Sequence, residues 1–144
     1  MLPPYPGQQE DVVQEQIGFL TKFLGYELRS AERYRRFVSL VMVASPQGNE
    51  RVNRLLGDSL RTSDVVADFD GASVILMSET NSAGALSAIE RYKNNETIKN
   101  VHDLRFSLVT FPADNGGSES MIASAFRRLQ KAAEGDPGAV IMTG

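Results

Sequence analysis

The feature that most constrains this chain is an unbroken apolar run at residues 37–44, FVSLVMVA. A valine-rich run without polar alternation is typical of a central β-strand that is covered on both faces. It is far shorter than the roughly 20 residues that span a bilayer, so the sequence predicts no membrane span. The chain must therefore place other elements on both sides of a sheet.

Helical and strand patterns alternate on either side of this run. Apolar residues at spacings of three and four predict helices over 10–36, 50–61 and 118–133, and a further helix that begins at Thr80 or Ser82 as its cap. Strands are predicted at 65–69, 73–77, 104–111 and 139–142. The order α-β-α-β-β-α-β-α-β predicts a mixed sheet with helices on its faces.

With 144 residues, of which 42% are hydrophobic, the chain is expected to form one domain with a short appendage. We expect a flexible tail at 1–9, a leading helix at 10–36 and the domain proper at 37–144. The leading helix is longer than a small domain can cover. Either its first half projects and pairs with a second copy through a stripe that includes Ile17 and Leu24, or the whole stripe packs on its own domain.

Composition excludes several functional classes. The net charge of −3 argues against binding to a nucleic-acid polymer. The sequence contains no cysteine, which rules out a disulfide framework. His102 stands alone, so no zinc site is expected, and no glycine-rich phosphate loop is present. The first residues lack the basic and apolar regions of an export signal, which predicts a cytoplasmic protein.

Four strings in the same order and at similar spacing resemble the GGDEF domains of diguanylate cyclases. They are ELRSAERYRRFVSLVMV, RTSDVVADFDGASVILMSET, LRFSLVTFPAD and AFRRLQKAAEGDPGAVI, and together they cover about residues 20–142. The second string resembles the family stretch R-x-x-D-x-x-A-R-Y-G-G-D/E-E-F. The resemblance implies an α/β (α+β) fold like that of nucleotidyl cyclases: a mixed central sheet of about five strands flanked by helices, with a long N-terminal helix.

The signature hairpin departs from the family pattern. It is one residue short and reads Asp70, Gly71, Ala72, Ser73 and Val74. In the family an acidic residue of this turn and an aspartate that ends the first strand hold magnesium; here the acids are replaced by Ala72 and Ser73, and the strand ends at Ala44. The stretch that recognises guanine is compressed to SPQGN. The resemblance therefore implies no catalytic residue, no metal site, no cofactor and no enzyme activity.

A second family motif is retained. Many cyclases of this family bind their product, cyclic di-GMP, at an R-x-x-D motif ahead of the hairpin and at an arginine in the following helix. Arg61, Asp64 and Arg91 stand at these positions. Arginine can pair with phosphate or with the O6 and N7 edge of guanine, and a carboxylate can accept the guanine N1 and N2 protons. Because Arg91 lies about ten residues into its helix, we expect that only a large ligand bridges it to Arg61.

A structural role is the alternative for each of these residues. Arg61 can cap the second helix, Asp64 can simply open the next strand, and Arg91 can belong to a solvated helix face.

Three functions follow from these patterns. The first is a non-catalytic receptor in which cyclic di-GMP, a regulatory ligand, changes contact with a protein partner or a second copy. The second is a ligand-free scaffold that dimerises through helix 10–36. The third, a residual nucleotide-processing enzyme, has the least support because the magnesium carboxylates are replaced.

Overall fold

The computed structural model describes residues 9–45, 52, 56, 59–69, 72–94, 104–114, 116–136 and 138–144, without the side chains of 9–17, 68 and 69. Its elements are α1 (Gln9–Tyr34), β1 (Val38–Ala44), β2 (Val65–Phe69), β3 (Ala72–Ser78), α3 (Ser82–Asn94), β4 (Arg105–Phe111), α4 (Ser118–Ala133) and β5 (Val140–Ile141). The predicted tail at 1–8, the SPQGN stretch beyond Ser45, and His102 lie outside the described residues. Of the predicted second helix, Val52 and Leu56 are described, and both are helical and buried.

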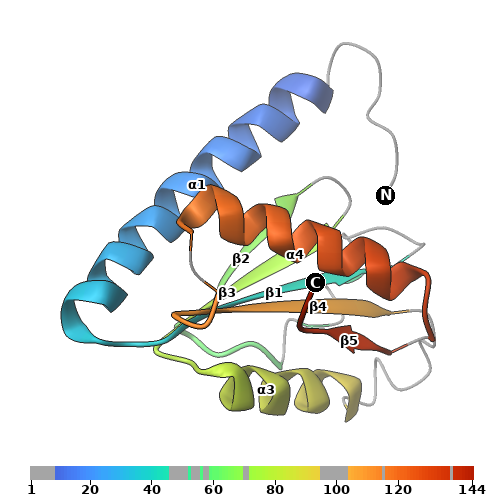
Figure 1. Cartoon of the computed structure of the whole chain (residues 1–144). Coiled ribbons are helices and arrows are strands. Elements are labelled where there is room, and N and C mark those ends of the chain that lie inside the picture. The colour runs from blue at the N-terminus through green and yellow to red at the C-terminus, as the bar shows by residue number, and fades with distance from the viewer. Residues whose placement is uncertain are drawn as a thin grey trace.

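One five-stranded sheet in the order β2-β3-β1-β4-β5 forms the middle of the molecule (Figure 1). Strand β1 is central and antiparallel to both β3 and β4, whereas β5 runs parallel to β4. The sheet is therefore mixed, as predicted, and the apolar run at 37–44 supplies its central strand.

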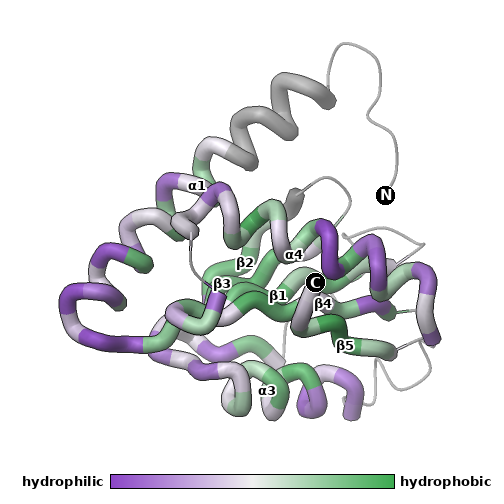
Figure 2. The backbone as a smooth tube through the Cα atoms, viewed as in Figure 1, coloured by the Kyte–Doolittle hydropathy of each residue, from purple (hydrophilic) through white to green (hydrophobic). Residues whose placement is uncertain are grey.

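Helices cover both faces of the sheet, with α1 and α4 on one side and α3 on the other (Figure 1). Side chains of β1 alternate between the two cores, as the two-residue period of a strand requires. Leu40 and Met42 join the core under α1 and α4, and Val41 and Val43 join the core under α3. Figure 2 shows the hydrophobic strands enclosed between helices whose outer parts are more hydrophilic.

The apolar stripe of α1 packs on its own domain from Leu20 onward. Leu20, Leu24 and Leu28 are all buried, and Leu24 has 0% exposure. The prediction that Leu24 lines a stripe shared with a second copy is therefore wrong, because α1 and α4 together close over this side of the sheet. The side chain of Ile17 lies outside the described residues, and the N-terminal part of α1 extends beyond the sheet (Figure 1).

Helix α3 begins with a cap that the sequence analysis misplaced. The side-chain oxygen of Asn81 accepts a hydrogen bond of 2.8 Å from the Gly84 N–H, and the Asn81 carbonyl accepts the first helical bond, from Ala85. Asn81 is therefore the N-cap, and neither Thr80 nor Ser82 takes that role. The Thr80 hydroxyl instead donates to the Ser78 carbonyl at 2.9 Å, which holds the end of β3.

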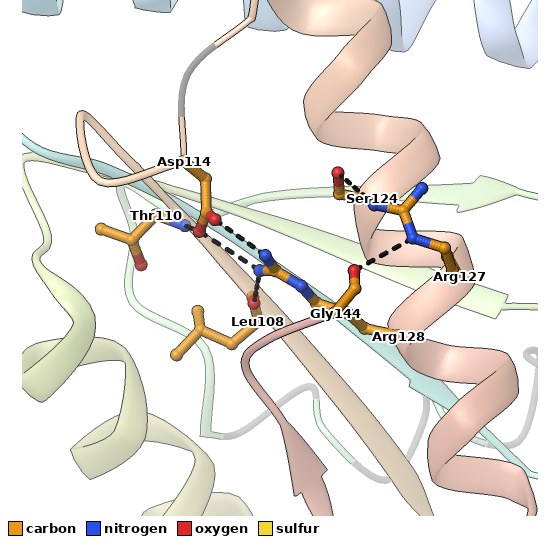
Figure 3. Close-up of polar contacts among 7 residues, drawn as sticks. All are labelled: Leu108, Thr110, Asp114, Ser124, Arg127, Arg128 and Gly144. Atoms are coloured by element: carbon orange, nitrogen blue, oxygen red, sulfur yellow. Dashed lines mark hydrogen bonds and ion pairs between the residues drawn. The ribbon is translucent and has the colours of Figure 1, made fainter.

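A partly buried ion pair fastens α4 to the sheet (Figure 3). The Arg128 guanidinium donates to the Leu108 carbonyl at 2.7 Å and to the two carboxylate oxygens of Asp114 at 2.7 and 3.2 Å. Asp114 also accepts a bond of 2.9 Å from the Thr110 N–H. The pair joins the end of β4, the turn that follows it and the middle of α4, which fixes how α4 lies over the core.

Candidate functional site

The Arg61–Asp64 stretch forms a tight turn immediately before β2. The Asp64 carboxylate accepts a hydrogen bond of 2.8 Å from the backbone N–H of Arg61, and the Asp64 N–H donates to the Arg61 carbonyl at 3.0 Å. Asp64 thus opens the strand, as the structural alternative predicted. The same turn leaves the Arg61 side chain exposed and the Asp64 side chain only partly buried, so both stay within reach of solvent.

Arg91 brings helix α3 to this turn. Its Nε and Nη2 both donate to the Ser59 carbonyl, at 3.3 and 3.2 Å. Ser59 lies two residues before Arg61, so the helix passes alongside the segment that carries the motif. We expected a wide separation between Arg91 and Arg61, but these bonds hold Arg91 beside a residue two positions before Arg61. The structure brings the three predicted residues into one neighbourhood.

Tyr92 is the residue of this neighbourhood that the sequence analysis missed. It is fully buried in the core under α3, and the Arg91 guanidinium stands 5.7 Å from the centre of its ring. Burial, reinforced by the Asp64 carboxylate, raises the pKa of the Tyr92 hydroxyl to about 12, against the opposing charges of Arg91 and Arg61. The hydroxyl is therefore neutral at ordinary pH. At helical spacing an inward tyrosine simply predicts a core residue, so the pattern held no signal for a polar role.

The residues on either side of the hairpin turn between β2 and β3 meet at one end of the sheet. Ala44, the last residue of β1, pairs with Ala72, the first residue of β3, and Ser73 pairs with Val43. Phe69 of β2 also pairs with Ala72, so Asp70 and Gly71 connect the strands, although they lie outside the described residues. Val74 points into the core under α1 and α4.

Ala44 and Ala72 do not fit a hard-cation site. Methyl groups stand at Ala44 and Ala72, and a methyl group offers no lone pair to magnesium. Across the described ranges, no three His, Cys, Asp or Glu side chains gather closely enough to hold a metal.

A helix that could span a bilayer is not found either: none in the described part of the chain combines the length and the apolar character that crossing requires.

Comparison with solved structures identifies the fold of this chain. No family model and no curated protein matches the chain. Among solved structures, a truncated form of TpbB (YfiN) from Pseudomonas aeruginosa that comprises only the GGDEF domain matches with a TM-score of 0.74 and 16% identity, over 88% of each chain. The chain has the GGDEF fold.

Two further structures with the GGDEF fold agree. The active GGEEF domain of a diguanylate cyclase from Vibrio cholerae gives a TM-score of 0.67 at 9% identity, over 87% of this chain and 94% of that one. The diguanylate cyclase SiaD from Pseudomonas aeruginosa, solved with its activator SiaC, gives 0.71 at 13% identity, over 87% of this chain and 57% of that one. At these identities the likeness establishes the fold, and the function has to be argued from the site.

Proposed function

We propose that this GGDEF-fold domain is a non-catalytic receptor for cyclic di-GMP, which binds Arg61, Asp64 and Arg91 and alters contact with a protein partner. The observation that carries the proposal is the pair of bonds from Arg91 to the Ser59 carbonyl, because they bring the guanidinium of α3 beside the Arg61–Asp64 turn. Two guanidinium groups and one carboxylate in one neighbourhood are a suitable set for a ligand made of phosphates and guanines.

Charge supports an anionic ligand at this place. Arg61 and Arg91 contribute two positive charges and Asp64 one negative charge, in a chain whose overall charge is −3. Both arginine side chains are exposed, so a ligand can reach them without unfolding the core. Within the described ranges, the Arg91 guanidinium donates to a single acceptor, the Ser59 carbonyl. A ligand phosphate could replace this neutral acceptor with a charged one, which forms a stronger hydrogen bond.

The non-catalytic part of the proposal rests on the sheet end that holds Ala44 and Ala72. Phosphoryl transfer depends on metal ions that neutralise the phosphates and position them, and these side chains cannot ligate one. We expect no product when the protein is incubated with GTP and either magnesium or manganese. The appearance of cyclic di-GMP in that reaction would support the residual enzyme instead.

Calorimetric titration with cyclic di-GMP, with GTP as the control nucleotide, tests the receptor directly. Arg61→Ala should weaken binding about 10- to 150-fold, the range that corresponds to the loss of hydrogen bonds from a charged group. Arg33→Ala is the matched control, since Arg33 is also an exposed arginine, on α1. Equal affinities for the wild type and Arg61→Ala would contradict the assignment of the site.

A scaffold function is the second candidate, and a specific observation favours it. All of the exposed large hydrophobic residues in the described part of the chain lie between residues 19 and 37: Phe19, Tyr26, Tyr34 and Phe37 are 46–67% exposed. Three of them lie on α1, and Phe37 lies between the end of α1 and the start of β1.

The same aromatic residues indicate how the protein partner of the receptor could be bound. SiaD shows that a diguanylate cyclase that shares this fold can bind a protein activator.

If the domain is a scaffold alone, it will bind no nucleotide, and the double variant Phe19→Ser with Tyr26→Ser will no longer self-associate in light scattering, without a loss of stability. Unchanged mass for that double variant, together with nucleotide binding by the wild type, would leave the receptor as the function.

A further inference from the structure

The Tyr92 hydroxyl is buried without a hydrogen bond to any residue in the described part of the chain. The side chain has 0% exposure, and its oxygen has no partner among the residues that the structure describes. Buried polar atoms are nearly always paired, because an unpaired one loses its bonds to water and receives nothing in return. A phenylalanine would fill the same space without that cost. The hydroxyl therefore calls for an explanation outside the free protein, and such violations tend to occur at functional sites.

The position of the hydroxyl supplies that explanation. Arg91 stands over the Tyr92 ring, with its guanidinium 5.7 Å from the ring centre, and is held there by the Ser59 carbonyl. The charges of Asp64, Arg91 and Arg61 all act on the hydroxyl, so it lies on the side of α3 that faces the motif. Arg91 in its observed position thus lies over the Tyr92 ring, beside the turn that carries Arg61 and Asp64.

We propose that Tyr92 is a ligand-contacting residue of the cyclic di-GMP site, uncovered when Arg91 leaves the Ser59 carbonyl for a phosphate, so that its hydroxyl donates a hydrogen bond to a phosphate oxygen. This inference rests on the proposed function and deepens it. In this proposal Arg91 has two positions. Hydrogen bonds to the Ser59 carbonyl hold it in the free protein, and hydrogen bonds to the ligand hold it in the complex. The neutral hydroxyl is a donor throughout the range of pH in which the protein would be studied.

The same displacement couples the ligand to the fold. Arg91 is a link between α3 and the segment that leads into β2, so its transfer to the ligand releases that segment from the helix. Asp64 continues to hold the turn through the Arg61 N–H. Binding should therefore change the environment of Ser59 while the hydrogen bonds of the turn persist.

Tyr92→Phe tests the inference, with Ser107→Ala as a matched control. The Ser107 hydroxyl is also buried and unpaired among the described residues, but β4 directs it to the opposite face of the sheet from Phe106 and Leu108, which belong to the core under α3. Each variant deletes one orphan hydroxyl, and neither should lower the melting temperature. Tyr92→Phe should weaken cyclic di-GMP binding about tenfold, the effect of losing one good hydrogen bond. Ser107→Ala should bind as the wild type does.

The outcomes separate this inference from the function on which it rests. If the wild type binds cyclic di-GMP, Arg61→Ala weakens binding and Tyr92→Phe does not, only the role of Tyr92 is overturned. A marked loss of stability in Tyr92→Phe would also overturn it, because the hydroxyl would then be paired in the free protein. If the wild type binds no cyclic di-GMP, both proposals fail together. Weaker binding by Tyr92→Phe at unchanged melting temperature, with Ser107→Ala unaffected, is the expected result.

Discussion

Replacing Asp114, the more exposed partner of the ion pair under α4, should lower the free energy of unfolding more than replacing the buried Arg128. The Arg128 side chain is 7% exposed and that of Asp114 is 28% exposed. In Asp114→Ala the Arg128 guanidinium stays buried, and among the described residues it keeps the Leu108 carbonyl as a hydrogen-bond acceptor. A buried charge that loses its partner typically costs 3–5 kcal/mol, and we take the lower end, about 3 kcal/mol, because the vacated side admits some water.

Arg128→Met leaves a milder defect. The Asp114 carboxylate keeps its bond of 2.9 Å from the Thr110 N–H, and its exposed oxygen can be hydrated. Methionine also replaces the apolar stem of the arginine. The expected loss is about 1.5 kcal/mol. The double variant leaves no buried charge unpaired and should lose about 2 kcal/mol, less than Asp114→Ala alone.

Urea denaturation followed by circular dichroism at neutral pH measures all three free energies of unfolding. Arg127→Met is the control, since the neighbouring arginine is exposed and should change stability by less than about 0.5 kcal/mol. The reasoning is refuted if Arg128→Met costs more than Asp114→Ala, or if the double variant loses the sum of the single losses.

Two other predictions concern stability. Burial by itself raises the pKa of Asp114, but hydrogen bonds from its arginine partner and from a backbone N–H, with the arginine charge, outweigh burial and lower this pKa below its usual value. The Asp114 carboxylate therefore contributes its full stabilisation above the unfolded pKa of about 3.9, and this contribution is lost as the pH falls through the folded pKa. The difference in unfolding free energy between the wild type and Asp114→Asn, measured in urea, should therefore narrow from pH 7 to pH 3. At the start of α3, Asn81→Ala should cost about 1 kcal/mol in the same assay, whereas Ser82→Ala should cost little; the reverse order would restore Ser82 as the cap.

The fold followed from periodicity because its signals are local and strong. The apolar run at 37–44 requires covering layers, and Asp70-Gly71 between two β-rich runs requires a hairpin, so the mixed sheet and its flanking helices could be predicted. The N-cap of α3 could not be predicted, because Thr80, Asn81 and Ser82 are all good capping residues. Which of them caps the helix depends on the exact residue at which β3 ends. The burial of Leu24 depended on how α1 and α4 close over the sheet, which no periodicity of a single helix reveals.

The site was predictable in part. The spacing of Arg61 and Asp64 relative to the hairpin indicated the motif, and the resemblance indicated Arg91. What the sequence did not contain is the path of α3 across the sheet, which places Arg91 at the Ser59 carbonyl. Tyr92 stayed hidden for the same reason: a buried aromatic residue is ordinary until its hydroxyl is found unpaired beside charged neighbours.

One titration tests the central claim most directly: cyclic di-GMP added to the purified wild type and to Arg61→Ala, with heat of binding as the signal. The account predicts saturable binding by the wild type that the substitution weakens at least tenfold, and no comparable binding of GTP. A wild-type protein that takes up no cyclic di-GMP, or that binds it just as well after loss of the Arg61 guanidinium, would contradict the account.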